Sequence, residues 1–130
     1  MTNSVITDFV DAVNKHDVLA ILGSLSDDHV FIDAYGSELS GHKALAEAWY
    51  TYFKWFPDYT IELKEMICGN DVYAIFGFAS GTFQGVVDEN NINYWRLPAA
   101  WKAVVSKEKI NLWQVYCDTK IPFDKMVNKC

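Results

Sequence analysis

The spacing of the apolar residues changes near residue 57, and this change restricts the folds that the chain can adopt. Up to Phe56 the apolar residues recur every three or four positions, which is the spacing of one face of an α-helix. From Tyr59 onwards they alternate with polar residues or form continuous runs, as they do in strands. Helices that come first and strands that follow predict an α+β fold, in which the helices pack on one face of a curved antiparallel sheet.

Glycine, proline and capping residues set the bounds of the predicted elements. Asp17 can cap a short second helix, residues 27–29 are predicted to form a turn, and Pro57 ends the third helix. Gly77 and Gly81 interrupt a long apolar run, which predicts a strongly bent strand. The predicted helices span residues 4–15, 17–25 and 42–56, and the predicted strands span residues 30–32, 59–68, 72–83, 95–105 and 110–118.

The third predicted helix carries one wide apolar face, which we expect to meet the core. The core face of the helix is expected to run along Leu45, Trp49, Tyr52 and Phe56, with Lys43, Glu47 and Lys54 exposed.

No repeat, linker or low-complexity tract interrupts residues 1–130, so we expect a single domain.

Charge and cysteine content exclude several classes of partner. The chain has 130 residues with 11 Lys and Arg against 17 Asp and Glu, a net charge of −6, which argues against nucleic-acid and membrane partners. No apolar run approaches the roughly 18 residues of a membrane span, and Asp8 and Asp11 interrupt the N-terminal apolar stretch, unlike a signal peptide. Cys68, Cys117 and Cys130 are scattered, which favours a reducing, cytoplasmic location, with a disulfide through Cys130 as the alternative.

Four segments, in their order and spacing, resemble the nuclear transport factor 2-like superfamily, in particular its ketosteroid-isomerase and SnoaL-type polyketide-cyclase branches. The resemblance implies a cone-shaped sheet wrapped around a long helix, an apolar pocket at the wide end, and a homodimer through the outer sheet face. The segments that carry it are DFVDAVNKHDVLAILGSLSDD (8–28), VFIDAYGSELSGHKAL (30–45), FPDYTIEL (56–63) and KINLWQVYCD (109–118).

Asp33 falls where this resemblance places the general base of ketosteroid isomerases. A carboxylate at a strand end that faces an apolar cavity loses hydration and can shuttle a proton between carbons. The alternative is that Asp33 only orders the loop before Gly36, a common role for Asp at such a junction. Both interpretations follow from the sequence.

The residues that would stabilise an enolate oxygen in that family are missing from this chain. The resemblance matches Phe9 to the donor Tyr and, counted from Pro98, Ala100 to the donor Asp, and loss of a single such donor costs roughly 3 to 4 kcal/mol. Steroid-type isomerisation is therefore disfavoured. The chemistry of limonene epoxide hydrolase is disfavoured too. The resemblance of residues 112–118 to the last strand of that enzyme places Val115 where its water-activating Asp would be, and Arg96, the only arginine, belongs to no Arg-x-Asp pair.

For each remaining candidate residue, a structural or solvent-exposed role is the alternative to a functional one. His16, His29 and His42 lack metal-ligand spacing and are expected to be solvated or capping, with His42 as a weak proton partner for Asp33. Lys102 either faces a pocket or is solvated, if Trp101 and Ala103 are the inward residues. No cofactor or metal is indicated, and the 5 Trp, 7 Tyr and 8 Phe exceed what a small core usually needs. The candidate pocket-lining residues are Phe9, Trp49, Tyr52, Phe53, Ala100, Lys102, Trp113, Val115 and Cys117, with plain core packing as the alternative.

Three hypotheses for function follow. The first is an isomerase-like or cyclase-like enzyme in which Asp33 moves a proton on a small lipophilic carbonyl substrate. The second is a non-catalytic module that binds a small apolar ligand in the same cavity. The third is a dimeric scaffold whose aromatic residues fill the cone.

Overall fold

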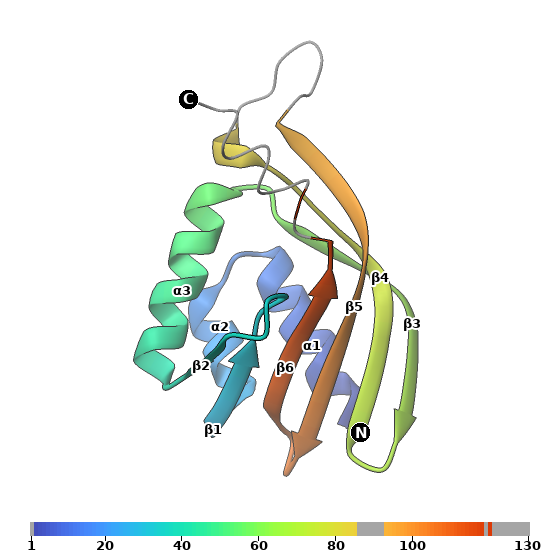
Figure 1. Cartoon of the computed structure of the whole chain (residues 1–130). Coiled ribbons are helices and arrows are strands. Elements are labelled where there is room, and N and C mark those ends of the chain that lie inside the picture. The colour runs from blue at the N-terminus through green and yellow to red at the C-terminus, as the bar shows by residue number, and fades with distance from the viewer. Residues whose placement is uncertain (1, 86–92, 119, 121–130) are drawn as a thin grey trace.

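The change of spacing near residue 57 corresponds to the end of the last α-helix, but two strands, at residues 25–32 and 38–40, already precede that helix. The computed structural model describes residues 2–85, 93–118 and 120. Within them, three helices lie against one curved six-stranded sheet that does not close into a barrel (Figure 1). The elements are α1 (Thr2–Asn14), α2 (Val18–Gly23), β1 (Leu25–Ile32), β2 (Glu38–Ser40), α3 (His42–Trp55), β3 (Thr60–Gly69), β4 (Val72–Thr82), the 3₁₀ turn η1 (Phe83–Gly85), β5 (Tyr94–Ser106) and β6 (Lys109–Cys117).

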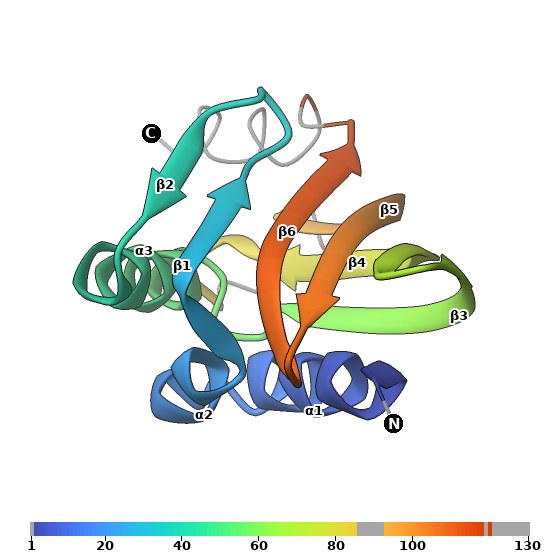
Figure 2. The same ribbon diagram turned by 90° about the horizontal axis from the view of Figure 1, so that it is seen from below.

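The helices form where the sequence predicts them and for the expected reasons. Asp17 caps α2, since its side chain accepts a hydrogen bond from the backbone N–H of Ala20 at 3.1 Å. Figure 2 shows α1 and α2 below the sheet and α3 beside β1 and β2. The expected apolar face of α3 is confirmed: Leu45, Trp49, Phe53 and Phe56 are buried, Tyr52 is half-buried, and Lys43, Glu47 and Lys54 are exposed.

The strand order is β2-β1-β6-β5-β4-β3, and one pair departs from the expected antiparallel arrangement. All neighbours are antiparallel except β1 and β6, which run parallel. The predicted turn at residues 27–29 is wrong, because these residues belong to β1. Although residues 27 and 28 are polar and exposed, His29 is buried, and its Nδ1–H donates to the carbonyl oxygen of Ile110 at 2.6 Å.

The sheet bends strongly between β3 and β4, as the glycine positions predict. The β3–β4 register shifts between Leu63 and Glu65, opposite Gly77. The two backbones approach so closely there that a Cβ on Gly77 would lie 1.9 Å from the carbonyl oxygen of Glu62. Only glycine fits at this point of the bend.

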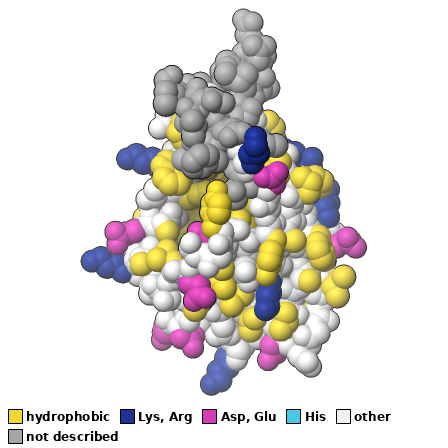
Figure 3. All heavy atoms as spheres, in the orientation of Figure 1, with side chains coloured by type: hydrophobic (Ala, Val, Ile, Leu, Met, Phe, Trp, Pro, Cys, Tyr) yellow, Lys and Arg dark blue, Asp and Glu magenta, His cyan; other side chains and the backbone are white. Residues whose placement is uncertain are grey.

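The two faces of the sheet differ in what covers them. On β5 the alternate residues from Trp95 to Val105 face the interior and are buried. Ala100 and Lys102 lie on the opposite, outer face, so they do not line the interior as expected. Both faces of this strand carry apolar residues, so the alternation in the sequence does not tell which residues point inward. The outer face also carries Phe76 and Tyr116 as exposed apolar residues, and Figure 3 shows hydrophobic and charged side chains intermixed over the side of the molecule seen in Figure 1.

Candidate functional site

Asp33 orders the loop between β1 and β2. Its Oδ1 accepts hydrogen bonds from the backbone N–H groups of Tyr35 at 2.9 Å and Ser37 at 3.0 Å. The backbone N–H of Asp33 donates to the carbonyl of Ser37, and Gly36 N–H donates to the carbonyl of Asp33, both at 3.0 Å. Among the described residues, nothing donates a hydrogen bond to the second carboxylate oxygen, Oδ2. The loop-ordering role is therefore present, and one carboxylate oxygen is left to accept a proton.

Aromatic rings pack against one another between α1, α3 and the sheet. Phe9 lies 4.6 Å from Trp113 and 6.1 Å from Trp49, measured between ring centroids. Trp49 also meets Phe31 at 6.0 Å and Phe53 at 5.4 Å. Phe9, Trp49, Phe53 and Trp113, all expected pocket residues, are thus buried members of one aromatic cluster.

A second group near the end of α3 adds polar atoms to this interior. Tyr52 meets Tyr59 edge-on at 4.9 Å, and Tyr59 lies 6.2 Å from Trp95. Burial raises the pKa of both tyrosines, and the neighbouring Cys117 adds to the effect. Burial likewise raises the pKa of the Cys117 thiol. All three groups are therefore uncharged hydrogen-bond donors at neutral pH.

The sequence predicts part of this interior and misses the rest. Tyr52, Val115 and Cys117 are half-buried and pack against the core. Tyr59 and Trp95 were not expected to line it. Tyr59 precedes β3 and Trp95 is the second residue of β5, and near the end of a strand the alternation offers few neighbours from which to judge the inward face.

The three histidines each bond a main-chain carbonyl. His16 Nε2–H donates to Tyr59 at 2.9 Å, and the His16 ring stacks on Phe53 with centroids 4.0 Å apart. His29 is 1% exposed, so the expectation that it is solvated is wrong, and burial lowers its pKa. His42 opens α3 as expected, and its Nε2–H donates to Ser26 at 3.0 Å.

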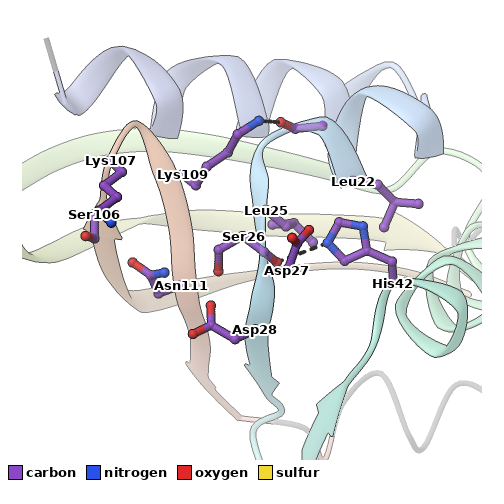
Figure 4. Close-up of a pocket in the computed structure, with 11 residues that line it drawn as sticks. Leu22, Leu25, Ser26, Asp27, Asp28, His42, Ser106, Lys107, Lys109 and Asn111 are labelled. Carbon is purple, nitrogen blue, oxygen red and sulfur yellow. Dashed lines mark hydrogen bonds between the residues drawn. The ribbon is translucent and has the colours of Figure 1, made fainter.

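His42 lines a polar hollow of about 660 Å³ at the end of the sheet where β1 begins (Figure 4). Asp33 is not among the residues that line this hollow, and none of the described contacts joins Asp33 to His42. A hydrogen bond from Ser26 is the main cause of a lowered pKa of Asp28. The hollow mixes acidic and basic groups and is lined by Leu22, Gly23, Leu25, Ser26, Asp27, Asp28, His42, Ser106, Lys107, Lys109 and Asn111.

Three further features bear on the class of site. Within residues 2–85, 93–118 and 120, no three His, Cys, Asp or Glu side chains come together as metal ligands. Over the same residues, every helix is too short or too polar to cross a membrane. Cys68 and Cys117 are free thiols, and Cys130 lies outside the described residues.

Residues 6–110 match the SnoaL-like domain family. The chain belongs to this family. No functionally curated protein matches this SnoaL-like chain in sequence.

Several solved structures share the fold of the SnoaL-like chain. A Catenulispora acidiphila protein with a ketosteroid isomerase-like fold, in complex with trimethylamine, has 16% identity and a TM-score of 0.75 over 86% of this chain and 83% of its own. A Shewanella denitrificans protein provisionally named a SnoaL-like polyketide cyclase has 10% identity and a TM-score of 0.81 over 98% of each chain. An LEH-like epoxide hydrolase of M. tuberculosis has 14% identity and a TM-score of 0.78 over 98% of this chain and 90% of its own. These identities establish the fold and not the reaction.

Proposed function

We propose that this SnoaL-like chain transfers a proton within a small lipophilic carbonyl compound held against the aromatic interior, with Asp33 as the general base. The observation that carries the proposal is the fixed Asp33 carboxylate. Two backbone N–H groups hold Oδ1, so the carboxylate keeps one orientation while Oδ2 accepts no hydrogen bond from the described residues. Asp33 directly follows the end of β1, two positions after Phe31.

The interior suits an apolar substrate. Phe31 contacts Trp49 in the aromatic cluster, which connects the end of β1 to the core. Asp33 would take a proton from the carbon next to a carbonyl group and return it to the same or another carbon. Tyr52 and Tyr59 remain protonated at neutral pH, since burial raises the pKa of each, and they do not compete as bases.

The proposal is tested by hydrogen exchange into a ketone. In D₂O, the wild-type protein should accelerate deuterium incorporation next to the carbonyl of 1-tetralone, followed by NMR. Asp33→Asn keeps an oxygen that can accept from Tyr35 and Ser37 but removes the base, so the acceleration should fall by about a hundredfold or more. Asp27→Asn removes the charge of an exposed carboxylate that does not bond the loop, so it is the control and should behave as wild type. An Asp33→Asn protein as active as wild type would refute the role.

A second candidate function is non-catalytic binding of a small apolar ligand. It is favoured by the loop-ordering hydrogen bonds of Asp33 and by the donors that the chain lacks. Phe9 stands in the aromatic cluster without a donor, and Ala100 lies on the outer face. This function predicts saturable binding of 1-tetralone by wild type, with no acceleration of exchange.

The assembly proposed for either function is a homodimer through the outer face of the sheet. Four large apolar side chains on the outer face of the sheet are exposed, namely Ile67, Val72, Phe76 and Tyr116. An apolar face of this kind is typical of a protein interface. The core cluster joins residues from α1 to β6, which supports a single domain, and the free thiols of Cys68 and Cys117 support a cytoplasmic location.

A further inference from the structure

Two buried tryptophans of β5 have indole N–H groups without an acceptor. Trp101 is 2% exposed and Trp95 is 5% exposed. The Nε1 atom of each is buried, and within the described part of the chain neither donates a hydrogen bond. Buried donors in native proteins almost always have a partner, which is protein, ordered water or ligand. Each N–H is therefore an unsatisfied hydrogen-bond donor, and the described residues supply no acceptor for it.

Both indoles lie on the interior face of β5. The ring of Trp101 stacks on Trp113 with centroids 6.1 Å apart, which makes it part of the aromatic cluster around Phe9. The ring of Trp95 meets Phe56 edge-on at 5.4 Å, close to the two interior tyrosines. The two donors thus stand at the two ends of one interior stretch of β5, and the interior residues between them are Leu97 and Ala99.

The side chains between the two indoles leave no acceptor from β5 itself. Leu97 and Ala99 have no polar side-chain atoms. In the register of the sheet, Ala99 pairs with Cys117 and Trp101 pairs with Val115. Cys117 is protonated at neutral pH, because burial raises the pKa of its thiol, and it is a poor acceptor. The walls beside the indoles therefore supply mainly apolar contact and donors.

The missing acceptor is expected to be uncharged. The buried polar residues of the described chain are Ser24, His29, Thr82 and Asn93, so no Lys or Arg is buried there to pair with an anion. A carboxylate or phosphate placed against the indoles would remain unpaired, at a high cost in free energy. The net charge of −6 also disfavours anions. A carbonyl oxygen accepts from N–H and carries no charge.

We propose that one of these two interior indoles, that of Trp101 or that of Trp95, donates its N–H to a carbonyl oxygen of the bound molecule, and that this donor selects neutral ketones or quinones over hydrocarbons and carboxylates. This inference rests on the proposed function, because it assumes a ligand in the aromatic interior. It assigns the hydrogen-bond donor to a side chain other than Phe9 and Ala100, neither of which can donate from its side chain.

The selection is tested by equilibrium dialysis with matched probes. 1-Tetralone, the hydrocarbon tetralin and the carboxylate 1-naphthoate have similar bicyclic frames. One N–H bond to a carbonyl contributes roughly five- to tenfold in affinity, so wild type should bind 1-tetralone that much more tightly than tetralin, and 1-naphthoate most weakly. Trp101→Phe or Trp95→Phe keeps a ring and removes a donor, and at least one of them should bring the ketone preference close to unity. Trp55→Phe, on the exposed surface of α3, is the control and should keep the preference.

A spectroscopic readout separates lost hydrogen bonding from altered packing. In ¹⁵N-labelled protein, the indole N–H proton signal of Trp101 or of Trp95, each assigned by its disappearance in the corresponding Phe variant, should move downfield with 1-tetralone and not with tetralin. Circular dichroism checks that each variant folds.

The outcomes distinguish the indole donors from the base. If both Trp variants keep the wild-type ketone preference, the donors bind water or remain unpaired and the inference is overturned. It is also overturned if wild type binds no ketone or binds tetralin equally well. If a Trp variant loses the preference while Asp33→Asn still exchanges hydrogen like wild type, the donor stands and the catalytic proposal fails. If only Asp33→Asn has an effect, the catalytic proposal stands and the role of the indole donors is refuted.

Discussion

Replacement of Gly77 by Ala should destabilise the protein more than any other single methyl group added at a described glycine. The new Cβ would lie 1.9 Å from the carbonyl oxygen of Glu62, 3.0 Å from its carbonyl carbon and 3.2 Å from the Cα of Leu63. All three atoms belong to the backbone of β3, so no side-chain rotation relieves the clash. The strand itself must move away by about an ångström, since a relaxed contact needs roughly van der Waals separation.

The size of the effect follows from that movement. Overpacking of a well-packed region costs typically about 1 to 3 kcal/mol. Separation of β3 from β4 beside the register shift would also weaken at least one ladder hydrogen bond, and a buried backbone group left unpaired costs about 1 to 3 kcal/mol. We therefore expect Gly77→Ala to lower the free energy of unfolding by about 3 to 5 kcal/mol.

Urea denaturation followed by far-UV circular dichroism measures the loss. It should be run at several protein concentrations, because a dimer makes the midpoint depend on concentration. Gly69→Ala is the matched control in the neighbouring strand, since a Cβ there meets nothing within 4 Å. It should change the free energy of unfolding by less than about 0.5 kcal/mol. A loss below about 1 kcal/mol for Gly77→Ala would show that the close approach does not exist.

Three other perturbations test the core, a buried histidine and the outer sheet face. Trp49→Ala should cost about 3 to 5 kcal/mol in urea denaturation, because the ring is buried in the aromatic cluster, and a loss under about 1 kcal/mol would contradict that packing. Burial lowers the pKa of His29 below its ordinary value of 6.5, so the unfolded chain takes up the proton at a higher pH than the folded chain does. The free energy of unfolding should therefore fall as the pH drops from about 6.5 towards 5, by up to about 1.4 kcal/mol per pH unit. His29→Gln should flatten this pH dependence, and an unchanged slope would mean that other titrating groups cause it. Light scattering of the wild type should give twice the chain mass of 14.8 kDa, and Phe76→Lys should shift it to a single chain, whereas a wild-type mass of 14.8 kDa would exclude the dimer at that concentration.

The sequence predicts the fold well where one physical signal dominates. The apolar stripe of α3 and the cap at Asp17 were both predicted, because helical spacing and a capping side chain act over a few residues. β1 was missed in part, because its polar residues Asp27 and Asp28 resemble a turn. Its pairing depends on β6, which lies far away in the sequence. Local patterns cannot reveal a partner strand at that distance.

The candidate site shows the same limit. The resemblance of its loop identifies Asp33. The structure shows its loop-ordering role, since Oδ1 accepts hydrogen bonds from the loop, whereas its role as a base stays a prediction. The inward face of β5 could not be chosen, because Ala99 and Ala100 are the same residue type on opposite faces. Nothing in a sequence tells whether the N–H of a tryptophan finds an acceptor. That information is geometric and appears only when the neighbouring strands are in place.

The parallel pairing of β1 with β6 also affects the order in which the chain can fold. The hydrogen bond from His29 to Ile110 joins residues 81 positions apart, and the pairing continues to Ile32 and Gln114. Contacts of such long sequence separation slow folding, since a large loop must close before they form. During synthesis, β1 emerges early and its partner emerges near the end. The N-terminal edge of the sheet, with β2 attached, must therefore wait for almost the whole chain, and until then its open backbone is exposed to pairing with other molecules.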